Sequence, residues 1–369
     1  MRPDLNTKSE VQMIIDNHVH AFPDQGGPET GPNPEYHVLM MQRTVKDFWG
    51  RMVSSHTDPK YIPGPDEDVD FKVGKYGRFH WEKFGESCWI QRGSPTFQAM
   101  EHPPEQMIAH MDLAGVDIGV IQAEYLELNK GRESYFAECL RKWPDRFIGT
   151  AAINYDLSKD DHYLESEIHK LTHAVEEDGF KALFISHVAN RQPMNDTRCD
   201  PLWNEVVRLG IPAYLNTGFT SRENYLGQLQ RTEEILEKHP GLNIVDAHVG
   251  GNIRHPSNPD YVETPQELDK LLRTGRFYIE VGYVLAYENF DIWGEDSQYP
   301  YPIHKQIIKT IYETYGATTM VWGSDMPWAL RVSTYRQNVD LIRLQTEFMN
   351  KKDRDLLIGG NLARLFKIV

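Results

Sequence analysis

The sequence is short of cysteine and of basic residues. Its 369 residues include three cysteines, none in a CxxC pair. We expect Cys88, Cys139 and Cys199 to be structural thiols in a reducing compartment, with a cysteine nucleophile as the minor alternative. Lysine and arginine total 39 against 54 aspartate and glutamate residues, a formal net charge of −15. This balance argues against a general nucleic-acid surface, because phosphate binding needs clustered Lys and Arg.

Long apolar runs are also missing. The first residues lack the apolar core of a signal peptide, and no later run has membrane-spanning length. We therefore expect a cytoplasmic protein with neither a membrane nor a nucleic acid as partner. Hydrophobic residues make up 40% and charged residues 25%, an ordinary globular balance. The length suffices for one large α/β domain over 1–369.

The sequence does contain a regular alternation of short apolar runs with helical periodicity. Eight runs are typical of strands, at 13–20, 116–123, 146–153, 180–186, 211–217, 243–248, 276–282 and 318–325. Helical patterns follow them, from 105 to Gly115 and near 133–143, 160–178, 202–209, 223–239, 265–274, 303–311, 334–350 and 353–366. Eight strand–helix units predict a closed (β/α)8 TIM barrel. An open doubly wound sheet is the alternative, disfavoured because no GxGxxG follows a strand.

One connection, the segment 21–104 between the first strand and the next helix, breaks this rhythm. It is rich in Gly, Pro, Trp, Tyr and Phe. Connections of this length usually carry function or a small structure of their own. Because barrel active sites lie at the carboxyl ends of the strands, we predict that this insertion is a cap or lid over the active site. A decorative cap is the alternative.

Ionisable residues end three of the predicted strands. His18 and His20 end the first, and strand alternation points both imidazoles to the same side, where they could meet one metal. His248 and Asp325 end the sixth and the eighth. A lone buried histidine is usually structural, but four such groups at one end of a barrel are hard to assign to packing, because unpaired buried charges are costly. These positions predict a metal or acid–base site.

Four motifs, in this order, resemble the amidohydrolase superfamily. They are IIDNHVHAF at 14–22, DAHVGGN at 246–252, VWGSDMPW at 321–328 and GGNLARLF at 359–366. The likeness covers 13–367 and is to the amidohydrolase-related (amidohydrolase 2) branch, with aminocarboxymuconate-semialdehyde decarboxylase-like enzymes and related lactonases. It implies a divalent metal, usually zinc and sometimes manganese, at the barrel mouth.

The resemblance also implies roles for single residues. His18, His20 and Asp325 match the metal ligands of the family. His248 matches the strand-six histidine that acts beside the metal on a bound water, so His248 and Asp325 are the catalytic candidates.

Asn216 departs from the family pattern, which usually has a metal-binding histidine at the end of strand five. An amide oxygen is a weaker ligand for zinc than an imidazole. Three arrangements stay open. His187, which ends strand four, replaces the nitrogen; Asn216 or water completes the metal site; or the site works without metal, as in lactonases that resemble 2-pyrone-4,6-dicarboxylate lactonase.

Polar residues near the presumed mouth are candidates for substrate binding: Asn216, Arg254, Arg331 and Glu280. The guanidinium fork of arginine suits a carboxylate, which predicts a small anionic substrate.

Two chemistries fit the resemblance. The favoured one is hydrolysis of an amide, a lactone or an activated C–C bond in a small, carboxylated cyclic or aromatic compound, through a metal-activated water. The other is non-oxidative decarboxylation of an aromatic or muconate-type acid. A ligand-binding barrel without activity is the third interpretation, and a homodimer is an open alternative to a monomer.

Overall fold

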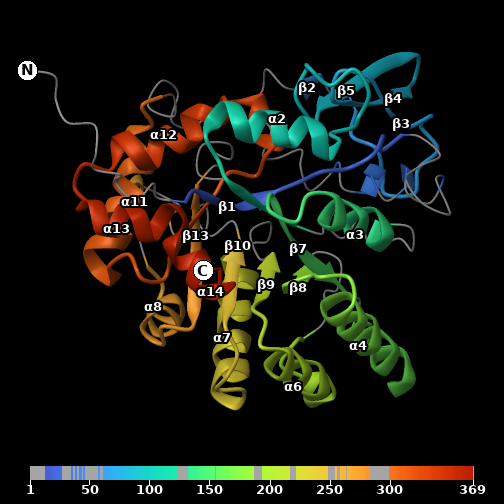
Figure 1. Cartoon of the computed structure of the whole chain (residues 1–369). Helices are drawn as coiled ribbons and strands as arrows, with labels where there is room; N and C mark the ends of the chain where they lie inside the picture. Colours follow the sequence, from blue (N-terminus) through green and yellow to red (C-terminus); the bar gives the residue numbers. More distant parts are fainter. Residues whose placement is uncertain are drawn as a thin grey trace, which may run out of the picture.

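The computed structural model describes residues 13–26, 35, 38–39, 41–43, 45, 57–58, 61–122, 132–153, 155–186, 193–216, 222–247, 254–255, 258–262, 264–282 and 299–368. Eight strands form one sheet in the order β1-β6-β7-β8-β9-β10-β13-β14 (Figure 1). Their bounds are β1 (Ile15–Val19), β6 (Ile118–Ile121), β7 (Phe147–Ala152), β8 (Ala182–Ser186), β9 (Ala213–Asn216), β10 (Ile244–Ala247), β13 (Phe277–Gly282) and β14 (Met320–Gly323). Every neighbouring pair is parallel.

The first strand and the segment after the last one close the sheet into a ring. Val19 pairs in parallel with Met326. The backbone N–H of His20 donates to the Met326 carbonyl at 2.6 Å. The predicted (β/α)8 barrel is therefore confirmed, and the open doubly wound alternative is wrong.

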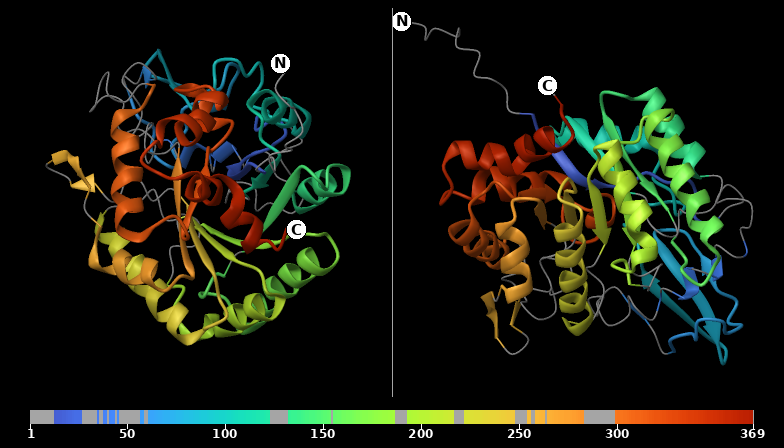
Figure 2. Two further views of the ribbon diagram at one scale, coloured as in Figure 1. Left: turned by 60° about the vertical axis from the view of Figure 1, so that its left-hand side comes forward. Right: turned by 90° about the horizontal axis from the view of Figure 1, so that it is seen from below.

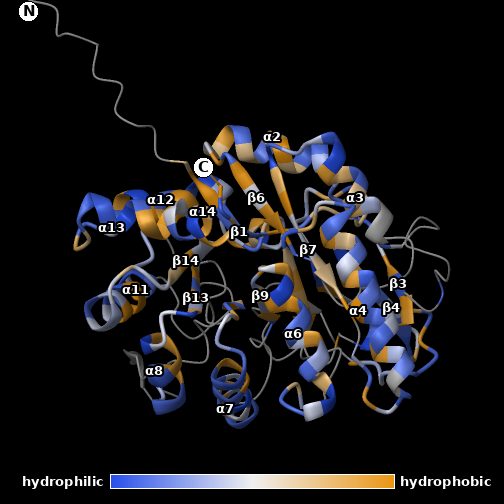
Figure 3. Ribbon diagram, turned by 60° about the horizontal axis from the view of Figure 1, so that its bottom comes forward, coloured by the Kyte–Doolittle hydropathy of each residue, from blue (hydrophilic) through white to orange (hydrophobic). Residues whose placement is uncertain are grey.

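Helices lie on the outside of the ring of strands (Figure 2). They are α2 (Pro104–Ala114), α3 (Arg132–Lys142), α4 (Asp161–Glu176), α6 (Asp200–Leu209), α7 (Arg222–Lys238), α8 (Gln266–Arg273), α11 (Pro302–Tyr315) and α12 (Tyr335–Gln345). Their outer sides are largely hydrophilic (Figure 3). Gly115 and Gly210 end α2 and α6 in the left-handed conformation, which favours glycine. Within the described ranges, no helix combines the length and apolarity needed to cross a bilayer.

The barrel interior is an apolar core, and residues near the C-terminus of the described chain cover it at the amino ends of the strands. Strand residues such as Ile15, Tyr214 and Val321 form one cluster with Leu362 and Phe366. The ring of Phe366 stacks on that of Tyr214 with centroids 6.4 Å apart. Leu362 and Phe366 thus pack against the strand residues that form the inside of the barrel.

The helix predicted near 353–366 is found, but it is not one continuous α-helix. The chain instead forms α13 (Lys351–Asp355), a π-helical turn over Leu356–Gly360 and α14 (Asn361–Leu365), with a kink at Gly359. A Cβ atom at Gly359 would lie 2.3 Å from the carbonyl oxygen of Met13. The kink therefore falls where the helix passes against the backbone that enters β1.

The insertion 21–104 contains a small antiparallel sheet of its own. Its order is β2-β5-β4-β3, with β2 (Thr57–Asp58), β3 (Lys72–Val73), β4 (Arg78–Lys83) and β5 (Glu86–Gln91). Backbone pairing of Phe22 with His102 holds the two ends of the insertion together. Its action as a lid stays a prediction.

A separate antiparallel pair of short strands, β11 (Arg254–His255) and β12 (Asn258–Val262), follows β10.

Candidate metal centre and active site

Three predicted ligands meet at the carboxyl end of the barrel. His18 is the last but one residue of β1, His20 directly follows the strand, and Asp325 lies two residues after β14. Their donor atoms lie within 4.8 Å of one another, and all three residues are buried. Nε2 of His20 lies 3.0 Å from Nε2 of His18 and 2.9 Å from Oδ1 of Asp325, which is 3.6 Å from Nε2 of His18. Two imidazole nitrogens and a carboxylate oxygen therefore face one point.

Asp325 reaches this point through an unusual backbone conformation. Its φ angle is 57°, in the left-handed region that non-glycine residues rarely adopt. Its carbonyl accepts a hydrogen bond from Ala329 N at 3.1 Å, in the 3-10 turn η7 (Trp328–Arg331). Such a conformation costs about 1–3 kcal/mol and persists where the surroundings fix it, often at functional sites.

Glu280 orients the imidazole of His18. Its Oε2 atom lies 3.2 Å from His18 Nδ1 and accepts a hydrogen bond from Asn17 Nδ2 at 2.6 Å. Because a carboxylate accepts, Nδ1 carries the proton and Nε2 presents its lone pair to the centre. Burial lowers the pKa of His18, but the charge and hydrogen bond of Glu280 outweigh burial, so the pKa is raised.

A break in the regularity of β1 makes this contact available. Strict alternation would place Asn17 and His18 on opposite sides, yet both contact the same oxygen of Glu280. The pairing of β1 with β6 shifts register between Asp16 and Val19. Gly323 provides the room, because a Cβ atom there would lie 2.5 Å from Glu280 Oε2 and 2.9 Å from His18 Cβ.

Asp16 joins the two segments that carry the candidate ligands. It accepts hydrogen bonds from the backbone N–H groups of His18 and Ser324, both at 2.9 Å. The hydroxyls of Ser324 and Tyr335 also donate to it, the latter at 2.8 Å. Burial raises the pKa of Asp16 to about 6, although these hydrogen bonds oppose the rise. Sequence reasoning gave Asp16 no role, and its place two residues before His18 was the available signal.

The sequence of this chain matches one protein family over nearly its whole length. The Amidohydro_2 family, described as amidohydrolase, matches residues 15–368. This chain belongs to the amidohydrolase family. No curated protein matches the sequence significantly.

Solved structures share the fold of this amidohydrolase at low identity. A probable 2-pyrone-4,6-dicarboxylic acid hydrolase from Acinetobacter baumannii, with citric acid bound, is 16% identical with a TM-score of 0.56, over 96% of this chain and 99% of that one. A 5-carboxyvanillate decarboxylase from Novosphingobium aromaticivorans, in complex with manganese and a nitrobenzoic acid, is 14% identical with a TM-score of 0.56, over 100% of both chains. A 2,6-dihydroxybenzoate decarboxylase from Rhizobium is 17% identical with a TM-score of 0.52, over 72% and 88%.

The side chains of this amidohydrolase fit a divalent metal. Two imidazole nitrogens and a carboxylate are ligands that zinc and manganese accept. Asn216, the residue at the usual histidine position, ends β9 and is buried. Its Oδ1 atom has no hydrogen-bond donor in the described part of the chain. A buried amide oxygen without a donor is costly, and a metal would satisfy it.

The other predicted site residues are only partly placed. His187 and His248 lie outside the described residues. They directly follow Ser186 and Ala247, whose strands flank β9 at Asn216 in the sheet register. Glu280 is brought to the candidate centre, but as a partner of His18 rather than as an open polar group.

Neither predicted substrate-binding arginine is brought to His18 and His20 by the described contacts. Arg254 lies in β11, and its side chain is outside the described part. Arg331 donates from Nε to the carbonyl of Trp328 at 3.1 Å and from Nη1 to that of Gln91 at 3.4 Å. It therefore ties the insertion to the barrel.

Arg92, at the end of the insertion sheet, is a residue that sequence reasoning missed. Its guanidinium carbon lies 3.9 Å from the centroid of the Trp328 ring, and Arg92 is 6% exposed. Trp328 in turn lies 6.2 Å from His20 between ring centroids and stacks on Phe22 at 4.9 Å. A buried cation from the insertion is thus linked to a candidate metal ligand through the Trp328 ring.

The buried thiols do not resemble nucleophiles. Cys88, Cys139 and Cys199 are free and buried. Burial raises the pKa of Cys139 and of Cys199 to about 12, so both are protonated near neutral pH. These thiols fit the structural interpretation.

Replacing Glu280 by glutamine tests the orientation of His18. The change keeps the shape but replaces the charged carboxylate that holds the Nδ1 proton with a neutral amide, so the metal dissociation constant should rise about 10–100-fold. Competition with a chromophoric chelator measures it. The exposed Glu313→Gln variant is the control and should bind metal as the parent does. Equal affinities in both variants would contradict an orienting role for Glu280.

Proposed function

We propose that this amidohydrolase is a metal-dependent hydrolase of a small, carboxylated cyclic or aromatic compound. The convergence of His18, His20 and Asp325 carries the proposal. A divalent metal bound there, with zinc proposed and manganese as the alternative, polarises a carbonyl and lowers the pKa of water.

The protein's own residues would divide the remaining tasks. Asp325 lies within hydrogen-bond distance of His20 and would accept a proton from the attacking water. His248, directly after β10, would move a proton to the leaving group. His187 would add a ligand, with Asn216 contributing its buried oxygen. Phe22 and Trp328, stacked beside His20, would limit the access of bulk water.

Arg92 supports an anionic substrate. The Arg92 guanidinium lies over the Trp328 ring, and its fork of N–H donors suits a carboxylate. We propose that Arg92 binds the substrate carboxylate, together with Arg254 and with Arg331 at the junction of insertion and barrel. The A. baumannii relative, a probable dicarboxylic acid hydrolase with citric acid bound, is in keeping with this substrate class.

Decarboxylation of an aromatic acid is the second candidate. It is supported by the N. aromaticivorans decarboxylase, which matches over 100% of both chains at the same TM-score as the hydrolase. In this reaction the metal would hold the carboxylate and its neighbouring oxygen, and His248 or Asp325 would protonate the ring carbon.

One assay separates the two reactions. The zinc- and manganese-loaded protein is incubated with 2-pyrone-4,6-dicarboxylate and with 5-carboxyvanillate, while ultraviolet absorbance and released CO2 are followed. Hydrolysis predicts ring opening of the lactone without CO2, and Asp325→Asn is the inactive control. If CO2 is released from the aromatic acid and the lactone is not opened, decarboxylation would replace hydrolysis as the proposed activity. Turnover that survives complete metal removal would contradict both forms of the proposal.

A further inference from the structure

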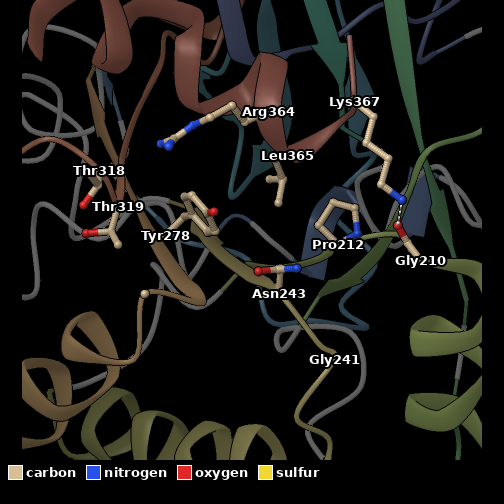
Figure 4. Close-up of a pocket in the computed structure, with 11 residues that line it drawn as sticks. Gly210, Pro212, Gly241, Asn243, Tyr278, Thr318, Thr319, Arg364, Leu365 and Lys367 are labelled. Atoms are coloured by element: carbon tan, nitrogen blue, oxygen red, sulfur yellow. Dashed lines mark hydrogen bonds between the residues drawn. The ribbon is translucent and has the colours of Figure 1, made fainter. Parts of the chain in front are cut away.

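A cavity lies at the opposite end of the barrel from His18 and His20. It measures about 540 Å³ and opens among the residues that precede four neighbouring strands, β9, β10, β13 and β14 (Figure 4). From α14 and the residues after it come Arg364, Leu365 and Lys367. Cavities of this size hold small organic molecules. We call it the floor pocket.

The charged side chains that line the floor pocket are both basic. Arg364 and Lys367 contribute two cations, and none of the described lining residues is an aspartate or glutamate. Within the described ranges, neither forms an ion pair; Arg364 donates to Asn361 Oδ1 and Lys367 to the Gly210 carbonyl at 3.5 Å. In a chain of net charge −15, two cations that pair with no described carboxylate make this pocket a local positive site.

The two cations lie at different ends of the pocket. Figure 4 shows Arg364 extended towards Tyr278 and Lys367 towards Gly210, with Leu365 between them. Burial raises the pKa of Tyr278, although the charge of Arg364 opposes the rise, so its hydroxyl remains a donor. Asn243 and Thr318 add further polar groups to the lining. The wall thus offers positive charge and donors at its ends and an apolar centre.

We propose that the floor pocket binds a small organic dianion, with one carboxylate or phosphate group at Arg364 and Tyr278 and the other at Lys367. Its apolar body would lie on Leu365 and Pro212. This proposal does not depend on the reaction proposed above, because the pocket lies at the amino ends of the strands and the candidate metal ligands at the carboxyl ends.

Calorimetric titration with adipate, a six-carbon dicarboxylate, tests the proposal on the metal-loaded protein. Adipate should bind at one site that persists in His20→Ala. Arg364→Gln and Lys367→Gln should each weaken it about tenfold, the effect of losing one charge-assisted hydrogen bond. Arg343→Gln and Lys352→Gln are the controls, because both residues are exposed and lie outside the pocket. These variants should bind adipate as the parent does. Hexanoate, with one carboxylate, should bind more weakly than adipate.

Fructose 1,6-bisphosphate, titrated in parallel, distinguishes a phosphate from a carboxylate preference. Melting temperatures confirm that each variant is folded. The proposal is overturned if neither dianion binds at millimolar concentration, if Arg364→Gln and Lys367→Gln bind as the controls do, or if His20→Ala abolishes binding.

Discussion

Replacing His20 with alanine should reduce bound metal from about one ion per chain to nearly none and remove activity with it. His20 Nε2 contacts both His18 and Asp325, so its loss removes the ligand nitrogen that lies close to both of the other described candidates. A metal at a hundred times its dissociation constant stabilises a fold by about 2.7 kcal/mol. The melting temperature of the variant should therefore equal that of the metal-stripped parent. Elemental analysis and calorimetry measure both quantities.

His162→Ala is the matched control, because His162 is 90% exposed on α4. It should keep metal, activity and melting temperature. A His20→Ala protein with a full complement of metal would show that the ion binds elsewhere. The proposed function would then lose its main support.

Replacing His248 with alanine should lower kcat about 10²–10⁴-fold, the usual contribution of general acid–base catalysis. Metal content and melting temperature should stay near those of the parent, because the proposed role of His248 is proton transfer and not metal binding. His248→Asn, which cannot shuttle a proton, should be similarly slow. Stopped-flow or steady-state kinetics on the identified substrate provide the measurement.

The exposed His173→Ala variant controls for the loss of an imidazole and should keep normal kcat. Loss of metal together with activity in His248→Ala would make His248 a ligand. Near-normal kcat would instead leave Asp325 as the remaining candidate base.

The barrel was predictable because its signals are local. Apolar runs, helical stripes and a stopping glycine such as Gly115 depend on neighbouring residues, and each of the eight predicted strands is found. The position of His18, His20 and Asp325 at strand ends was predictable for the same reason. The kink at Gly359 was not, because it reflects a close approach to Met13, more than three hundred residues away in the sequence.

The surroundings of the candidate ligands were beyond sequence reasoning because their contacts are long-range. Glu280 was expected to bind substrate, but it lies against His18, 262 residues away. Asp16 accepts from Tyr335, 319 residues away. The alternation in β1 correctly placed His18 and His20 on one side, but it did not predict that Asn17 and His18 contact the same oxygen of Glu280, where the strand shifts register. The contact of Arg92 with Trp328 could not be predicted, because the insertion has no regular alternation of strands and helices from which the direction of a side chain could be inferred.

The placement of the ligands along the chain has a consequence for the protein's synthesis. His20 and Asp325 are 305 residues apart, and Leu362 and Phe366, which close the barrel interior, come later still. A nascent chain on the ribosome thus exposes the two candidate histidines 305 residues or more before it exposes Asp325. Since domains fold largely as units during synthesis, the three candidate ligands come together only after this long stretch of chain has been made. A product truncated before Asp325 lacks the carboxylate, so we expect that it cannot hold a metal stably.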